Sequence, residues 1–177
     1  MAEYLKVRSD NPEIRWIKRA VEVLTEGGII VYPTDSTYAI GCQMGDKKSL
    51  ERIRALRRLD PKHNLTLLCA DLSELSSYSQ VSNAAYRILK SHTPGPFTFL
   101  LKATPEVPRR LQHPKRKTIG LRIQSNTILH SLILASGEPI MSTSLILAGQ
   151  SVALSDPEEF RTELGSLVDL IIDGGVC

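Results

Sequence analysis

The amino-acid sequence predicts a single-domain α/β protein in which helices pack on a twisted, open, mixed β-sheet. Short apolar runs rich in β-branched residues alternate with segments whose apolar residues recur every three or four positions. Hydrophobic residues make up 42% of the chain and charged residues 23%, which are ordinary values for a globular domain. At about 150 residues per domain, one domain over residues 1–177 accounts for the whole sequence.

The elements follow one another with clear start and stop signals. A helix begins near Pro12, whose ring suits the first turn, and ends at the glycine pair Gly27-Gly28. A continuous apolar run over residues 29–32 then predicts a buried strand. Further helices are predicted over residues 47–57, 84–91, 128–135 and 156–164. Further strands are predicted over residues 65–69, 97–102, 118–123, 140–144 and 167–172.

Three long irregular stretches, 33–46, 103–117 and 145–155, are candidates for the functional site, because loops at strand ends usually form the site in α/β folds. The first of them opens with the sequence PTDSTY directly after a buried strand. Its hydroxyls and single acid can hold a polar ligand. An ordinary capped turn is the alternative, and the loop taken alone favours it.

Composition and motif content exclude several classes of protein. No apolar run approaches the ~18 residues of a membrane span, and the first residues lack a signal peptide, so we expect a cytoplasmic protein without a membrane partner. Three separate cysteines predict reduced, mostly buried thiols, and four dispersed histidines predict no metal site. The sequence contains no GxGxxG, no GxxxxGK(S/T), no GxSxG and no HExxH motif.

The charge distribution is uneven. Residues 47–122 hold sixteen Lys and Arg against five Asp and Glu, a net charge of +11, whereas both flanking segments are acidic. Such an asymmetry suggests a polyanionic partner, either nucleic acid or a nucleotide phosphate. A solvated surface whose charges mix after folding is an equally good interpretation of the charge alone.

Arg122 stands out because it lies inside the apolar run Ile119–Ile123. An arginine in a buried strand needs a carboxylate or a ligand as its partner. A structural salt bridge is one interpretation, and an anionic ligand group is the one that we slightly favour. The cations of the helix at 47–57 lie along one face and can contact phosphates, although cations also suit a helix C-terminus.

Taken together, four segments resemble motifs of the YrdC family, the threonylcarbamoyl-AMP synthases, in one order along nearly the whole chain. Residues 33–41 (PTDSTYAIG) are similar to PT(D/E)TxYGLG, and residues 93–98 (TPGPFT) to WPGPxT. Residues 118–124 (TIGLRIQ) are similar to TVAVRxP, and residues 169–175 (DLIIDGG) to DxIIDGG. Details resemble the YciO branch of that family, namely VPRR at 107–110, KRKTIG at 115–120 and STSL at 142–145.

The resemblance implies a YrdC-like fold with a large, positively charged concave surface. It implies ATP with magnesium, bicarbonate and L-threonine as substrates, no tightly bound cofactor, and threonylcarbamoyl-AMP and pyrophosphate as products for tRNA modification. It also implies binding of double-stranded RNA or tRNA. The implied nucleotide and substrate residues are Thr34, Arg57, Thr118, Arg122, Ser142 and Ser144. The implied phosphate or RNA surface consists of Arg52, Arg54, Arg58, Lys62, Arg110 and Lys115.

The departures from the family pattern concern the residues that meet the ATP phosphates. The KxRP motif has become RRLD, so that Arg57 replaces the lysine and Leu59 replaces the second arginine. The SxN motif has lost its asparagine to Ile146, and PLIVH has lost its histidine to Leu68. An arginine can replace a lysine on a phosphate with different geometry, whereas a leucine cannot replace a cation. The family usually continues with a further strand, which leaves a chain truncated at Cys177 as an open alternative.

These observations predict a YciO-type family member that binds a nucleotide such as ATP or AMP, double-stranded RNA, or both. Its synthase activity is expected to be weak, and its status as an enzyme stays open. One alternative is a competent synthase that rebuilt its phosphate contacts from Arg57, Arg58 and Lys62. The other alternative is a non-catalytic RNA-binding or ribosome-associated module.

Overall fold

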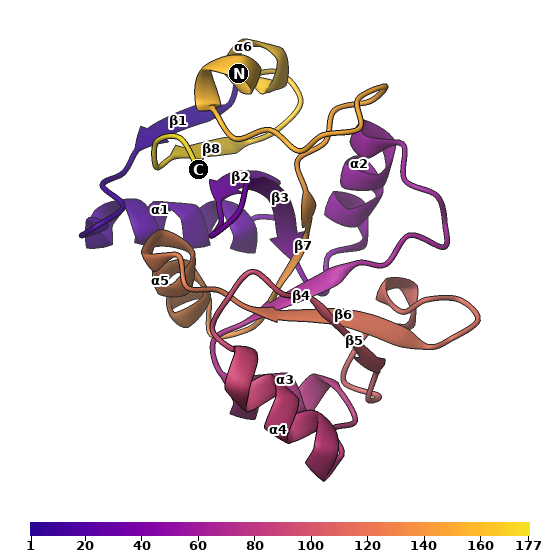
Figure 1. Cartoon of the computed structure of the whole chain (residues 1–177). Helices are drawn as coiled ribbons and strands as arrows, with labels where there is room; N and C mark the ends of the chain where they lie inside the picture. Colours follow the sequence, from indigo (N-terminus) through magenta and orange to yellow (C-terminus); the bar gives the residue numbers. More distant parts are fainter.

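The computed structural model describes all residues 1–177 as one mixed eight-stranded sheet with helices on both faces (Figure 1). The helices are α1 (Ile14–Thr25), α2 (Lys47–Arg57), α3 (Leu72–Tyr78), α4 (Asn83–His92), α5 (Thr127–Ser136) and α6 (Pro157–Leu164), with a 3₁₀ helix η1 (Arg109–Leu111). The strands are β1 (Glu3–Lys6), β2 (Ile30–Pro33), β3 (Tyr38–Gln43), β4 (Thr66–Cys69), β5 (Phe99–Lys102), β6 (Thr118–Ile123), β7 (Ile140–Ser144) and β8 (Leu170–Asp173).

The strand order is β1-β8-β2-β3-β7-β4-β6-β5. The pairs β1–β8, β2–β8 and β4–β6 are parallel, and the other four pairs are antiparallel. The α/β class and the mixed sheet predicted from the sequence are thereby confirmed. None of the helices is both long and apolar enough to cross a bilayer.

Alternating side chains along the strands build two separate cores. Ile29 and Val31 face the core beneath α2, α3, α4 and α6, whereas Ile30 and Tyr32 face the core beneath α1 and α5. The continuous apolar run of this strand is therefore explained by burial on both faces. The same alternation leaves Leu67 and Leu68 in β4 on opposite faces.

Local sequence signals set the ends of several helices. The side chains of Asp46, Ser82 and Asn126 accept hydrogen bonds from backbone N–H groups of the first turns of α2, α4 and α5. Gly137 ends α5 with a φ of 73°, a left-handed conformation that glycine adopts without a Cβ clash. Asn126 and Gly137 thus set the two ends of α5.

Several elements differ from the sequence prediction. Residues 33–46 were expected to be irregular, but β3 fills most of that stretch and pairs with β2 and β7. The prediction was wrong because part of the stability of β3 comes from its pairing with the distant strand β7, which no local pattern reveals. Strand β1 and helix α3 were not predicted, and helix α1 begins at Ile14 rather than near Pro12. Cys42 and Cys69 are buried as expected, whereas the Cys177 thiol is exposed.

Candidate functional site

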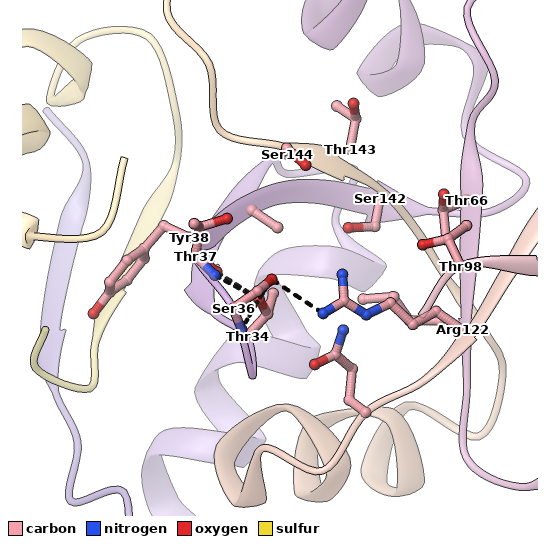
Figure 2. Close-up of a pocket in the computed structure, with 13 residues that line it drawn as sticks. Thr34, Ser36, Thr37, Tyr38, Thr66, Thr98, Arg122, Ser142, Thr143 and Ser144 are labelled. Atoms are coloured by element: carbon pink, nitrogen blue, oxygen red, sulfur yellow. Dashed lines mark hydrogen bonds between the residues drawn. The ribbon is translucent and has the colours of Figure 1, made fainter. Parts of the chain in front are cut away.

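A polar pocket opens on the sheet face that carries α1 and α5, in a region that neither helix lines (Figure 2). The turn after β2 forms one wall, and β3, β4, β6 and β7 contribute the other side chains. The cavity has a volume of about 50 Å³, well below the roughly 300–1,000 Å³ of typical ligand pockets. Its lining residues are Thr34, Ser36, Thr37, Tyr38, Ala39, Thr66, Leu68, Thr98, Arg122, Gln124, Ser142, Thr143 and Ser144.

Thr34 organises the turn that forms one wall of the pocket. Its Oγ1 accepts hydrogen bonds from the backbone N–H groups of Ser36 and Thr37, at 3.1 and 3.2 Å, and donates to the carbonyl oxygen of Thr37. Both interpretations of this loop therefore have a basis, because Thr34 is a turn-forming residue that also lines the pocket.

Arg122 projects from β6 into the pocket and forms an ion pair with Asp35. Its Nη2 donates to the Asp35 carboxylate and, at 3.1 Å, to Ser36 Oγ (Figure 2). The other Asp35 oxygen accepts from the backbone N–H and the hydroxyl of Ser125, at 3.2 and 3.1 Å. The side chains of Arg122 and Asp35 are only 14% and 9% exposed, so this pair is largely removed from water.

The Arg122–Asp35 pair does not use all the donors of the guanidinium group. Both of its hydrogen bonds are made by Nη2, while the buried Nε has no partner. An arginine in this apolar strand needs a carboxylate or a ligand as its partner, and the structure supplies the carboxylate of Asp35 while leaving Nε buried without a partner. Arg122 is largely buried and lines the pocket together with Thr34 and Ser144.

A hydrogen bond from Tyr32 holds the side chain of Ser142, which lines the pocket. The buried hydroxyl of Tyr32 donates to Ser142 Oγ at 2.7 Å. Burial raises the pKa of Tyr32 well above its ordinary value, so its hydroxyl stays protonated and acts as the donor. Gly41 leaves room for this contact, because a Cβ there would lie 2.4 Å from the Tyr32 hydroxyl oxygen. Ser142 therefore presents an oriented hydroxyl to the pocket.

Arg57 does not line the pocket. It reaches β7 from the end of α2, donating from Nε to the carbonyl oxygen of Ile146 at 3.0 Å and from Nη1 to Thr143 Oγ1 at 2.8 Å. No carboxylate forms an ion pair with it, and burial lowers its pKa below the ordinary arginine value. His63 Nε2 lies 3.3 Å from the same Thr143 hydroxyl. Leu59 packs partly buried against the larger core.

The residues predicted to form a phosphate or RNA surface do not gather at the pocket. Arg52 forms an ion pair with Asp169 at 2.8 Å, while Arg54 donates to the carbonyl oxygen of Arg110. Arg110 in turn donates to the carbonyl oxygen of Gly45, which joins this loop to the turn before α2. The three remaining members are exposed, namely Arg58, Lys62 and Lys115.

Of the six predicted ligand-binding residues, the structure brings four together in the pocket, Thr34, Arg122, Ser142 and Ser144. Thr118 begins β6, opposite Lys102 of β5, and does not line the pocket. Sequence reasoning missed Gln124, Thr66 and Thr98. The signal for Gln124 was available, because residues two apart on a strand share a face and Arg122 had already been singled out.

Comparison with known sequences defines the class of this α/β protein. The sequence model of the Sua5, YciO and YrdC proteins, described as "Telomere recombination", matches residues 22–177, and the chain belongs to this family. The resemblance inferred from the sequence motifs is thereby confirmed. The chain is 54% identical to the YciO protein of Escherichia coli strain K12, described as uncharacterized, over 175 residues that cover 99% of this chain and 85% of that protein.

Three further comparisons extend this relationship, one with a sequence and two with solved structures. The threonylcarbamoyl-AMP synthase of Vibrio vulnificus is 25% identical over 163 residues, covering 90% of this chain and 87% of the synthase. The crystal structure of E. coli YciO superposes with a TM-score of 0.97. That of P. abyssi Sua5 complexed with L-threonine superposes with a TM-score of 0.89 at 24% identity, covering 98% of this chain and 50% of Sua5. The last comparison shows a shared fold.

Proposed function

We propose that this chain binds an adenine nucleotide together with a small amino acid such as L-threonine, and that it retains weak threonylcarbamoyl-AMP synthase activity. The observation that carries the proposal is Arg122, a largely buried cation with an unpaired Nε at a pocket lined by hydroxyls. The relationship to the Vibrio vulnificus synthase and the L-threonine complex of P. abyssi Sua5 supports it.

The chemistry of the pocket suits this assignment. A carboxylate is the natural partner of a guanidinium donor, and the hydroxyls of Thr66, Ser142 and Ser144 can bind further oxygens of the ligand. Formation of threonylcarbamoyl-AMP from ATP with magnesium, bicarbonate and L-threonine requires positioning and stabilisation of phosphate charge. The residues at the family's phosphate-binding positions are altered, which is why we propose weak activity.

Calorimetry tests the proposal directly. Wild-type protein is titrated with L-threonine, with L-threoninol, which lacks the carboxylate, and with ATP and magnesium. We expect L-threonine to bind and L-threoninol to bind at least 10-fold more weakly, because a charge-assisted hydrogen bond is worth about 1.5–3 kcal/mol. Arg122→Lys should weaken L-threonine binding, whereas Arg116→Ala, on an exposed loop, should not. Equal affinity for L-threonine and L-threoninol would remove the basis of the assignment.

Double-stranded RNA is a second candidate ligand, and a specific observation favours it. Of the sixteen Lys and Arg in residues 47–122, only Arg52 and Arg122 form ion pairs with a carboxylate. The other cations keep their charge unneutralised in the folded chain, and the loop 115–117 exposes three of them in a row. Unpaired surface cations are what an RNA backbone binds, and they make its affinity strongly dependent on salt.

The dependence of RNA affinity on salt measures this contribution. The triple variant Lys115→Ala, Arg116→Ala, Lys117→Ala should lower the salt slope by about one for each phosphate contact that is lost. The matched control is Lys18→Ala, an exposed lysine on α1. An unchanged slope in the triple variant would contradict a role for this loop in RNA binding. Competition by ATP would distinguish a shared site from a separate surface.

A further inference from the structure

The side chain of Gln124 is the most deeply buried polar group at the pocket that keeps an unused hydrogen-bonding atom. Gln124 directly follows β6 and is only 2% exposed. Its Oε1 accepts a hydrogen bond from the backbone N–H of Asp35 at 3.1 Å. Its Nε2 is buried and has no hydrogen-bond partner. Buried amide groups in native proteins are almost always paired, so this one requires an explanation.

The orientation of the amide is fixed by its neighbour. The backbone N–H of Asp35 can only donate, so the amide oxygen must face it, and a flipped amide would place two donors against each other. Asp35 is itself held by Arg122 and Ser125, so the whole arrangement is anchored. Nε2 is therefore the unpaired end of the amide, in a side chain that lines the pocket.

Gln124 and Arg122 lie two residues apart, and both line the pocket. Each keeps one buried donor without a partner, the amide Nε2 and the guanidinium Nε. The single carboxylate at this wall, Asp35, already accepts from three donors. Two unpaired donors on side chains of the same pocket, beside an occupied carboxylate, match a ligand group that offers two acceptor oxygens and no proton, which is a carboxylate.

We propose that Gln124 is a ligand-binding residue that determines specificity, with Nε2 donating to one carboxylate oxygen of the ligand while Arg122 binds the other. This inference rests on the proposed function and deepens it, because it assigns the preference for a free carboxylate to two residues. A carboxamide offers only one acceptor oxygen and places an N–H₂ group against the second donor. The pocket should therefore prefer an amino acid over the corresponding amide.

The experiment uses two variants of Gln124 and two probes. Gln124→Glu keeps an acceptor for the Asp35 N–H but replaces the donor, and Gln124→Leu removes both groups. Both should bind L-threonine about 10- to 100-fold more weakly than wild type, the value of a hydrogen bond to a charged group. Affinity for L-threoninamide should change less than that for L-threonine. Gln80→Glu is the matched control, since Gln80 is exposed and lies outside the pocket.

The outcomes separate this inference from the proposed function. Wild-type affinity for L-threonine in folded Gln124→Leu and Gln124→Glu would overturn the inference and leave the proposed function intact. An equal loss in Gln80→Glu would also overturn it, because the effect would then not come from the pocket. Failure of the wild-type protein to bind L-threonine would contradict the proposed function, and the inference with it. Thermal unfolding of each variant confirms that the comparison is made on folded protein.

Discussion

The pocket and the end of α2 each contain a partly buried arginine, and the two arginines differ in the groups that accept their hydrogen bonds. In the pocket, Arg122 has a carboxylate partner in Asp35 and still keeps a buried Nε unpaired. At the end of α2, Arg57 has no carboxylate partner and donates from two nitrogens to a hydroxyl and a backbone carbonyl. The first region leaves a buried donor unpaired, and the second uses its cation to join α2 to β7.

The difference shows which part of a family site this chain keeps. The pocket retains its hydroxyls, its arginine and an anchored turn, so the anion recognition that we propose does not depend on the altered residues. At the motif position of the second arginine, Leu59 packs against the core instead, and Ile146 offers only its carbonyl oxygen to Arg57. The comparison predicts that ligand recognition and phosphate stabilisation can be changed separately.

The largest expected effect concerns synthase turnover. Losing one cation contact and one amide contact to ATP should cost roughly 2–4 kcal/mol, on the order of 30- to 1,000-fold in rate or affinity. Pyrophosphate release that depends on ATP and L-threonine should therefore be slower by this factor than in the Vibrio vulnificus synthase measured in parallel. Leu59→Arg combined with Ile146→Asn should raise ATP affinity.

The stability of that double variant must also be measured, because Leu59 is partly buried and its replacement removes core packing. A control variant separates the effect of this packing change from that of the new cation. Leu59→Gln with Ile146→Asn introduces a similar polar change without the cation. If this control raises ATP affinity as much as the arginine variant, the cation is not the missing element. Wild-type turnover equal to that of the Vibrio vulnificus enzyme would contradict the comparison and favour Arg58 or Lys62 as replacement contacts.

The next effect concerns the stability of the pocket. Arg122→Ala leaves the largely buried Asp35 carboxylate without its cation, which should lower the free energy of unfolding by about 3 kcal/mol. Arg122→Ala combined with Asp35→Asn should recover part of this loss, because the uncompensated charge is removed. Urea denaturation of the two single variants and the double variant measures the coupling. Additive losses in the free energy of unfolding would show that the ion pair does not stabilise the fold. The role of Arg122 would then be confined to ligand binding.

Much of the fold could be predicted from the sequence because its signals are local. Apolar runs such as residues 29–32, and caps such as Asn126, depend on their immediate neighbours. Strand β3 and strand β1 could not be predicted in this way. β3 pairs with the preceding strand β2 but also with the distant β7, and β1 adds to the edge of the sheet through the distant β8. Their stability comes from pairings that no local pattern reveals.

The site was predictable only in part, for a similar reason. An arginine within an apolar strand demands a partner, so Arg122 could be identified from the sequence alone. Its partner Asp35 and the anchored Gln124 depend on the close approach of the turn after β2 to the end of β6, which only the fold brings about. Arg57 illustrates the opposite case, since its motif position suggested a ligand and the structure gives it two internal acceptors.

The smallest expected effect is the influence of the Arg57 charge on the pKa of His63. Desolvation lowers the pKa of His63 below its ordinary value, and the nearby cations Arg57 and Arg54 lower it further. As the pH falls, His63 therefore takes up its proton at a higher pH in the unfolded chain than in the folded one. The contribution of neutral His63 to stability is present above about pH 6.5 and is lost as the pH falls toward the lower pKa of the folded state. An NMR titration should give a midpoint below 6.5 that rises in Arg57→Gln. Arg58→Gln, which removes a neighbouring exposed arginine, should raise it less. An unchanged midpoint in Arg57→Gln would mean that the charge of Arg57 does not reach His63, and the contrast with the neutralised pair in the pocket would no longer hold.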